Sequence, residues 1–487
     1  MSDKQIRRPD GTYAGAVTHE NIMAIFDGAG DFNLRELHVG GHTIYIYAID
    51  GLTSGGDISE LVVKPLLQDG FGGSMDELCD RALYATVYNA VALECETLSD
   101  ALDRLVNGFA VVLFGQRALA FEDKTDEKRS PSPPEAENTV KGAKDALTET
   151  LRTNTGLLRR HLRTPALRLY ETKLGRRSGT GVALVWLDGL TDPALVRRMK
   201  RRLSEPDIDG LVTPASVEEY LTGSRRTAFP LLKYTERTDR LARSLLDGRI
   251  ALLVDGLPLA YLAPVDLAFF MTAAEDEGTD WLSASFLRIL RYAGLLLSLL
   301  LPGLYIAMAA YHPQMLPMGL LRSIIESKQA VPFPTAVEVL GLLLAFELLQ
   351  EAGVSLPQAV GQTLSIIGGL VVGTAAVEAR VISPAALIVV AAAGICGFVL
   401  PGRDFADAMR LWRFLLAVLA VLGGLFGLTV GGILLLLHLA GLESFGRPYL
   451  APFSSMRGFR ALLRPRHIKT LYRDPALRPQ DIRNQKP

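Results

Sequence analysis

The run Leu415-Leu-Ala-Val-Leu-Ala-Val-Leu-Gly-Gly-Leu-Phe-Gly-Leu-Thr-Val-Gly-Gly-Ile-Leu-Leu-Leu-Leu437 carries no charged side chain. A helix of this length extends about 35 Å, enough to cross the hydrocarbon core of a bilayer. Three further apolar runs precede it, at 289–311, 360–377 and 382–400. One such run also suits the core helix of a soluble protein, but four in succession predict an all-α transmembrane bundle of about four spans.

The segment 335–352 is also strongly helical, but it carries three carboxylates, Glu338, Glu347 and Glu351. Carboxylates make a lipid-facing span costly, and inside a membrane they mark ion paths or buried pairs. We therefore interpret the segment as an interfacial, re-entrant or interior-lining helix, which leaves five or six spans as an alternative. The three glutamates are our candidates for a cation path. Their alternative role is interfacial anchoring or pairing with nearby cations, namely Arg322, Lys328 or Arg380.

Charge is distributed unevenly along the 487 residues, although 51 basic and 52 acidic side chains almost cancel. The net charge is −9 over residues 1–287, zero over 288–445 and +8 over 446–487. A basic segment directly after the last span favours the cytoplasmic side and anionic membrane lipids. The polar N-terminus does not resemble a signal peptide. A cytoplasmic N-terminal part then requires an even number of spans.

Two stretches before the apolar runs resemble each other, which indicates a duplication. The first is Ile44-Tyr-Ile-Tyr-Ala-Ile-Asp-Gly-Leu-Thr53 and the second is Val182-Ala-Leu-Val-Trp-Leu-Asp-Gly-Leu-Thr191. Segment 105–113 resembles 245–253 at nearly the same offset. The shared offset predicts two similar α/β subdomains, and chance recurrence of Asp-Gly turns is the alternative. In the second, we expect a hairpin over 249–262 with a two-residue turn at Asp255-Gly256.

The chain therefore divides into five predicted parts, giving a multidomain fold. These are an α/β subdomain at 1–121, a charged linker rich in proline and serine at 122–142, a similar α/β subdomain at 143–287, a transmembrane helical domain at 288–445, and a basic cytoplasmic tail at 446–487.

Catalytic motifs are absent from the sequence: it has no phosphate-binding glycine loop, no HExxH and no GxSxG. The seven histidines are scattered and the three cysteines are widely spaced. We therefore predict no enzyme, no cofactor and no metal site, and the near-zero net charge argues against a nucleic-acid partner.

Small residues recur every four positions in two of the apolar runs, a spacing that lets helix backbones approach closely. We expect them to pack helices within one chain, with a subunit interface or a pore-facing surface as the alternative. The residues are Gly361, Ser365, Gly369, Gly373, Gly423, Gly427 and Gly431.

Several motifs resemble the A subunits of GerA-type spore germination receptors. The family's first span and its exit look like Leu301-Pro-Gly-Leu-Tyr-Ile-Ala and Tyr311-His-Pro-Gln-Met-Leu-Pro317. Residues 356–369 and the stretch Ser444-Phe-Gly-Arg-Pro-Tyr-Leu-Ala-Pro452 resemble the most specific motifs of that family. A signature of the soluble part resembles Phe229-Pro230 followed by Thr235-Glu-Arg-Thr-Asp239, with threonine at 238 where proline is usual.

The resemblance implies a multi-pass protein of the bacterial spore inner membrane, with the N-terminal domain and the tail on the spore core side. It implies a homo-oligomeric, nutrient-gated channel for monovalent cations that initiates germination. The implied partners are a transporter-like B subunit and a lipoprotein C subunit. Stage V sporulation AF-type proteins, which would amplify germination ion release, share most of these motifs and remain an alternative. The residues are also compatible with a membrane scaffold or a solute carrier.

Overall fold

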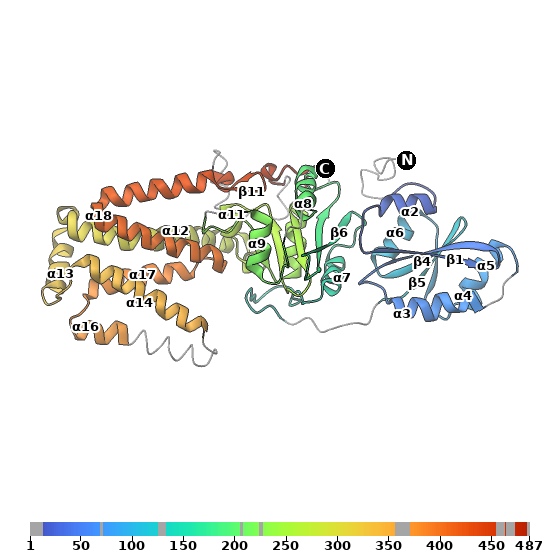
Figure 1. Cartoon of the computed structure of the whole chain (residues 1–487), viewed down its shortest axis with the longest axis horizontal. Helices are drawn as coiled ribbons and strands as arrows, with labels where there is room; N and C mark the ends of the chain where they lie inside the picture. Colours follow the sequence, from blue (N-terminus) through green and yellow to red (C-terminus); the bar gives the residue numbers. More distant parts are fainter. Residues whose placement is uncertain are drawn as a thin grey trace. The chain divides into compact units, whose positions relative to one another are not determined.

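The computed structural model describes residues 13–68, 72–124, 133–204, 208–223, 227–355, 371–453, 463 and 473–484. The chain forms two compact units, which we call the α/β unit and the helical unit (Figure 1). The α/β unit comprises Met1–Ser224, Leu232–Pro264 and Thr470–Pro487, and the helical unit comprises Arg225–Leu231 and Val265–Lys469. The division differs from the predicted bounds. The second α/β subdomain gives way to the helical unit after Pro264 rather than after 287, and the short internal segment Arg225–Leu231 belongs to the helical unit.

The α/β unit contains two five-stranded antiparallel sheets with the same strand order. The first sheet runs β1-β2-β4-β5-β3 and the second runs β6-β7-β9-β10-β8, so each strand has its counterpart five positions on. This shared topology confirms the two similar α/β subdomains. The strands of the first sheet are β1 (Phe32–Val39), β2 (His42–Ile49), β3 (Ala92–Cys95), β4 (Phe109–Phe114) and β5 (Arg117–Glu122). Those of the second are β6 (Leu167–Leu174), β7 (Thr180–Leu187), β8 (Lys233–Thr235), β9 (Ile250–Val254) and β10 (Ala260–Ala263).

Helices cover both faces of the first sheet. α2 (His19–Ile25) and α6 (Leu98–Val106) bury apolar side chains on one face. α3 (Gly55–Asp57), the π-helical turn Ile58–Val63, α4 (Lys64–Gln68) and α5 (Met75–Arg81) cover the other face. The central strand β4 is consequently buried on both sides along its whole length.

The second sheet is accompanied by α7 (Leu151–His161), α8 (Pro193–Leu203), α9 (Pro214–Thr222) and α10 (Thr238–Leu246). α8 begins just after Asp192, which caps the helix by accepting a hydrogen bond from the Ala194 backbone N–H. The predicted two-residue turn at Asp255-Gly256 is wrong. Ala260 pairs with Leu253, so a longer loop joins β9 to β10.

The described part of the helical unit consists mainly of packed helices. They are α11 (Leu267–Phe270), α12 (Trp281–Ile306) with its π-helical extension Ala307–Tyr311, α13 (Met318–Lys328), α14 (Thr335–Ser355), α16 (Ala376–Glu378), α17 (Pro384–Phe398) and α18 (Arg403–Gly441). Their shared core is apolar, with buried side chains from α12, α14, α17 and α18.

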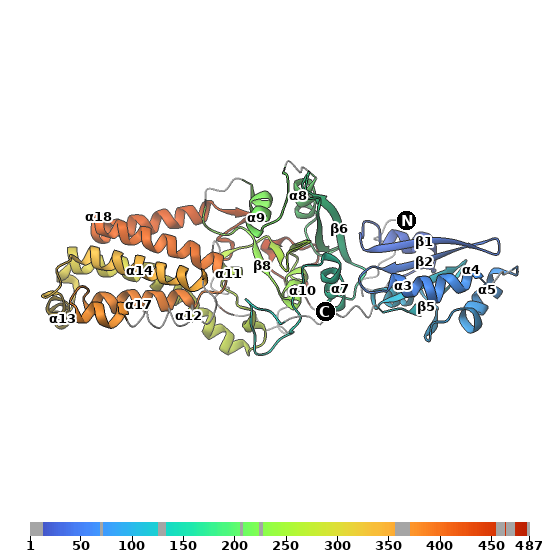
Figure 2. The same cartoon turned by 60° about the horizontal axis from the view of Figure 1, so that its bottom comes forward.

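α18 is not one straight helix, because the chain reverses at Gly423 and Gly424. Gly424 has φ of +58° and ψ of −137°, a conformation that favours glycine. The rings of Trp412 and His438 lie 5.7 Å apart, whereas a straight helix would separate them by about 40 Å. The two halves, 403–422 and 425–441, therefore form an antiparallel helical hairpin, which Figures 1 and 2 both show.

This reversal corrects the predicted single span at 415–437, because the run contains the corner of the hairpin. Within the described residues, two helices are long and apolar enough to cross a membrane, Trp281–Tyr311 and Arg403–Gly441. The second of these is the hairpin, whose halves extend about 30 and 25 Å at 1.5 Å per residue. α17 has only 15 residues, and the predicted span 360–377 lies mostly outside the described residues. The number of crossings stays a prediction.

The basic tail does not lie in one unit. Arg447 is buried in the helical unit, where it forms an ion pair of 2.6 Å with Asp266. Residues 473–484 belong to the α/β unit, where Arg473 donates to the Leu246 carbonyl at 2.9 Å. At least part of the tail's positive charge is therefore used inside the protein.

Candidate functional site: the buried charges of the helical unit

Glu347 of α14 is paired with two arginines of the first half of α18. Arg410 Nη1 donates to Glu347 Oε2 at 2.9 Å, and Arg413 Nη2 pairs with Glu347 Oε1. The Arg413 side chain is 2% exposed and that of Glu347 is 31% exposed. A guanidinium this deeply buried requires a carboxylate partner, because an unpaired buried charge is costly. The pair therefore ties α14 to the hairpin.

Two further polar groups complete this cluster. The side-chain oxygen of Gln350 accepts a hydrogen bond of 2.5 Å from Arg410 Nη1, and Asp407 pairs with Arg410 Nη2. The Gln350 amide thus accepts from a cation, which an arginine side chain at this position would be unable to do.

Glu338 lies in a different buried pair near the start of α14. Its Oε2 atom accepts hydrogen bonds from the Ser383 backbone N–H at 2.9 Å and from the Ser383 hydroxyl at 2.6 Å. Lys328 Nζ lies 3.6 Å from Glu338 Oε1. Ser383 is the N-cap of α17, so the Glu338 carboxylate also neutralises the positive end of that helix.

The three candidate glutamates therefore do not converge on one site. Glu338 pairs with Lys328, one of the cations proposed from the sequence, whereas Glu347 pairs with Arg410 and Arg413, which the sequence reasoning missed. The Glu351 side chain is exposed. The missed signal is the composition of residues 403–413 at the start of α18, where three arginines and two aspartates precede an uncharged run.

The glycine stripe in α18 packs the hairpin against itself. A Cβ on Gly427 would lie 2.9 Å from the Leu419 carbonyl carbon, and one on Gly431 would lie 2.5 Å from Leu416 Cδ2. Gly423 is at the corner. This supports intrachain packing, the first of the two predicted roles, for Gly427 and Gly431.

Gly373 gives no such contact, because a Cβ at that position meets no atom within 4 Å. Gly361, Ser365 and Gly369 lie outside the described residues.

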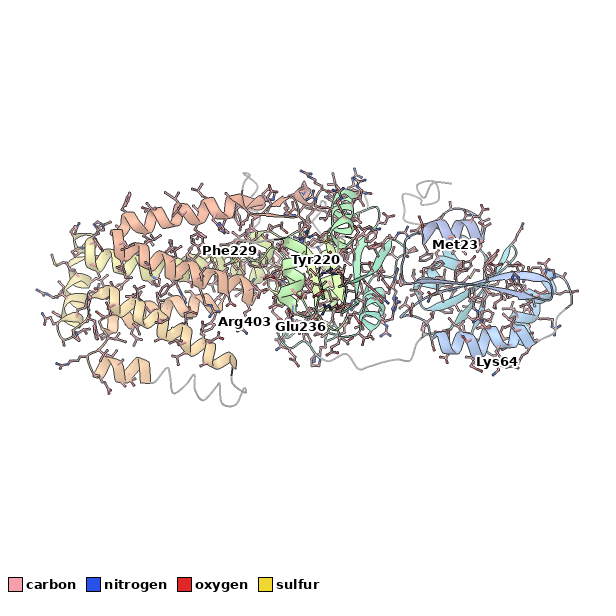
Figure 3. The ribbon with its side chains drawn as sticks, in the orientation of Figure 1. Met23, Lys64, Tyr220, Phe229, Glu236 and Arg403 are labelled. Carbon is pink, nitrogen blue, oxygen red and sulfur yellow. The ribbon has the colours of Figure 1, made fainter. Side chains whose placement is uncertain are left out.

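In the α/β unit, residues 235–239, which resemble the family signature, bind the second half of the linker. The Glu236 side chain, labelled in Figure 3, accepts hydrogen bonds of 2.6 Å from the backbone N–H groups of Ala136 and Glu137. Arg237 donates to the Thr139 hydroxyl at 2.7 Å and pairs with Asp239 at 2.6 Å. The linker is thus bound to the second subdomain over its described second half.

Glu137 of this linker segment is itself an acceptor for the second subdomain. Its carboxylate accepts from the Thr235 hydroxyl in β8 and pairs with Arg240 in α10. Nearby, His161 Nε2 lies 2.7 Å from Asp145 Oδ2. The hydrogen bond to Asp145 raises the pKa of His161 above its usual value. Burial raises the pKa of Asp145, but the hydrogen bond and charge of His161 more than offset this, so the net shift is downward.

The two subdomains are joined by a fully buried ion pair. Arg159 of α7 donates to both carboxylate oxygens of Asp31, at 2.7 and 2.8 Å, and neither side chain is exposed. Arg152 of the same helix pairs with Asp50, the aspartate of the first Asp-Gly-Leu-Thr motif, at 3.0 Å. The duplicated motif thus provides a contact for α7 in its first copy.

Comparison with known proteins places these features in a family. The Bacillus/Clostridium GerA spore germination protein family matches residues 20–476. The uncharacterized membrane protein YfkQ of Bacillus subtilis (strain 168) is 36% identical over 442 residues, covering 90% of this chain and 86% of that protein. Spore germination protein KA of the same organism is 35% identical over 453 residues, covering 90% and 81%. Spore germination protein GerLA of Bacillus cereus is 31% identical over 470 residues, covering 93% and 94%.

A solved structure is also similar to part of the chain. The crystal structure of the N-terminal domain of the A subunit of the Bacillus megaterium spore germinant receptor GerK3 is 26% identical, with a TM-score of 0.39. It covers 50% of this chain and 93% of that one. Because the family match extends over nearly the whole sequence, this chain belongs to the Bacillus/Clostridium GerA spore germination protein family.

Proposed function

We propose that this protein is an A-type subunit of a spore germination receptor and that it conducts monovalent cations across the spore inner membrane when a nutrient is sensed. Relatives named as spore germination proteins support the germination role. We further propose that it works as a homo-oligomer with a transporter-like B subunit and a lipoprotein C subunit. Its N-terminal part and tail would face the spore core.

The observation that carries the conduction proposal is the charge cluster inside the apolar helices. Glu347 of α14 pairs with Arg410 and Arg413 in the first half of the hairpin, at the charged start of a helix that is otherwise long and apolar enough to cross a membrane. Buried ionisable groups in membrane segments are costly and are typical of ion pathways and gates. Because Glu347 and Asp407 together offset the charges of the two arginines, the cluster is suited to a closed gate.

Opening would require this pairing to change. A ligand shifts the balance between two states only if it binds them differently, so a buried cluster with two pairing arrangements is a suitable bistable element. Breaking the Arg413–Glu347 pair in the closed state would leave a charge available in the path. The gate is therefore assigned to the contact between α14 and the first half of α18.

The test is ion flux through the purified full-length protein in liposomes loaded with potassium or sodium. We expect unitary currents or fast flux that does not saturate, and Glu347→Gln should change its rate. Saturable uptake of a solute without current would support a carrier instead. No flux in any preparation that retains its fold, alone or with B and C subunits, would favour the scaffold and refute conduction.

A second measurement separates the receptor from the AF-type alternative. The receptor proposal predicts that B-like and C-like subunits co-purify with the chain from spores. It also predicts that deletion of the gene abolishes the response to one nutrient. Deletion of an AF-type protein would instead slow ion release after every nutrient, and an AF-type protein would have no B-like or C-like partners.

A further inference from the structure

A short segment that branches from the second α/β subdomain is buried inside the helical unit. Residues 225–231 belong to the helical unit, whereas the residues before and after them belong to the α/β unit. Phe229, labelled in Figure 3, is completely buried. We call residues 227–231 the anchor segment.

Phe229 lies between the open ends of the α18 hairpin. Its ring centroid is 6.2 Å from that of Phe405 and 6.4 Å from that of Trp412, both in the first half. It is 5.9 Å from that of His438, near the end of the second half. The two halves of the hairpin are thus connected at one end by Gly423 and Gly424. At the other end, the Phe229 ring, which belongs to a different segment of the chain, packs between them.

Polar contacts fix the anchor segment to the end of α18. The hydroxyl of Thr227 lies 2.8 Å from His438 Nε2 and accepts from the Phe229 backbone N–H at 3.1 Å. The Ser444 hydroxyl donates to the Leu231 carbonyl at 2.8 Å and accepts from the Val265 backbone N–H at 3.0 Å. The Ser444 hydroxyl therefore binds Leu231 and Val265, the two residues of the helical unit next to which the described chain enters and leaves the α/β unit.

The anchor segment continues directly into the edge strand β8, which begins at Lys233. The other end of β8 is Thr235, whose hydroxyl donates to Glu137 in the linker. The anchor segment therefore lies just before the first residue of β8, and the contact with the linker lies at the last residue of β8. Only a few covalently linked residues separate the linker contact at Thr235 from Phe229, so a shift of the linker can displace Phe229 through β8.

We propose that Phe229 is a positioning residue for the hairpin, and that the anchor segment and β8 transmit the state of the linker between the α/β subdomains to the open ends of α18. Arg410 and Arg413 flank Trp412, so displacement of Phe229 reaches the Glu347 cluster through the helix that carries it. An effect of Phe229 on conduction rests on the proposed function, whereas the coupling between the linker and the hairpin does not.

The test is a double-mutant cycle read by hydrogen exchange of the full-length protein in lipid nanodiscs. Glu137→Ala loosens the linker contact. We expect it to accelerate exchange at the open ends of the hairpin, in peptides covering 403–412 and 434–441, by about tenfold, a coupling typical of contacting groups. In the Phe229→Ala background, Glu137→Ala should have no further effect on those peptides.

The control is Phe346→Ala, which removes a ring of the helical unit that contacts Phe398 and not the anchor segment. In that background the response to Glu137→Ala should persist. If Phe229→Ala fails to fold, Phe229→Leu and Ser444→Ala take its place and should reduce the response. A response of equal size with and without these changes, or no response in the wild-type background, would overturn the coupling.

Flux in liposomes gives the second reading. If the wild type conducts, Phe229→Leu should alter the flux, while Phe286→Ala, which removes an exposed ring of α12, leaves it near the wild-type rate. If the wild type does not conduct, the proposed function fails, and the exchange cycle still decides whether Phe229 couples the linker to the hairpin.

Discussion

Replacing Gly427 by alanine distinguishes the helical hairpin from a single long span. In the hairpin, the new Cβ would overlap the Leu419 carbonyl oxygen of the opposite half and would lie 2.9 Å from the carbonyl carbon. Carbon atoms in van der Waals contact are about 3.5–4.0 Å apart, so the two halves would have to separate by at least about 0.6–1 Å. The clash is with backbone, which has no alternative rotamer to adopt.

The expected magnitude follows from two opposing terms. Alanine is favoured over glycine in a helix by about 1 kcal/mol. Overpacking a close contact costs about 1–3 kcal/mol, and a backbone contact belongs near the upper end. We therefore expect Gly427→Ala to lower the free energy of unfolding by about 2 kcal/mol.

Gly432→Ala is the matched control, because a Cβ at that position meets no atom within 4 Å. It should stabilise the protein by up to about 1 kcal/mol through helix propensity alone. Both variants would be compared with the wild type by reversible denaturant titration in the same mixed micelles. Equal stabilisation by both substitutions would refute the hairpin, since a straight span places neither residue against another helix half.

Three further predictions concern other contacts. Asp31→Asn should lower the free energy of unfolding of the α/β unit, measured in urea, by about 3–5 kcal/mol because it leaves Arg159 buried without a counter-charge; replacing both residues by apolar ones should recover most of the loss. The raised pKa of His161 means that its pairing with Asp145 contributes fully below the unfolded-state pKa and is lost as pH rises through the folded-state pKa. His161→Asn should therefore flatten the fall in stability on that alkaline side, and an unchanged slope would contradict this pairing. Ser383→Ala removes a helix cap and a hydrogen bond to a buried carboxylate, and it should cost about 1–2 kcal/mol by thermal unfolding.

The sequence allowed the duplicated α/β subdomains to be predicted because local motifs carried the signal. Asp-Gly-Leu-Thr follows an apolar strand in both copies, and the shared strand order agrees with this repeat. It did not predict that residues 225–231 join the helical unit. That segment is short, and only the long-range packing of Phe229 assigns it there.

The helical unit shows where periodicity and hydropathy are insufficient. A hydropathy pattern counts apolar residues and does not sense the backbone, so the reversal at Gly423 and Gly424 was interpreted as part of one span. The partners of Glu347 were missed for a related reason. Arg410 and Arg413 are more than sixty positions away, and nothing local joins them to α14.

The central claim is that the Glu347 cluster controls cation passage during germination. The most direct measurement is nutrient-triggered release of monovalent cations from spores that carry Glu347→Gln at normal protein level. Glu326→Gln is the control, since Glu326 is an exposed acid of α13 in the same unit. We predict altered release for Glu347→Gln and wild-type release for the control. Release at the wild-type rate and extent in both variants would contradict the claim.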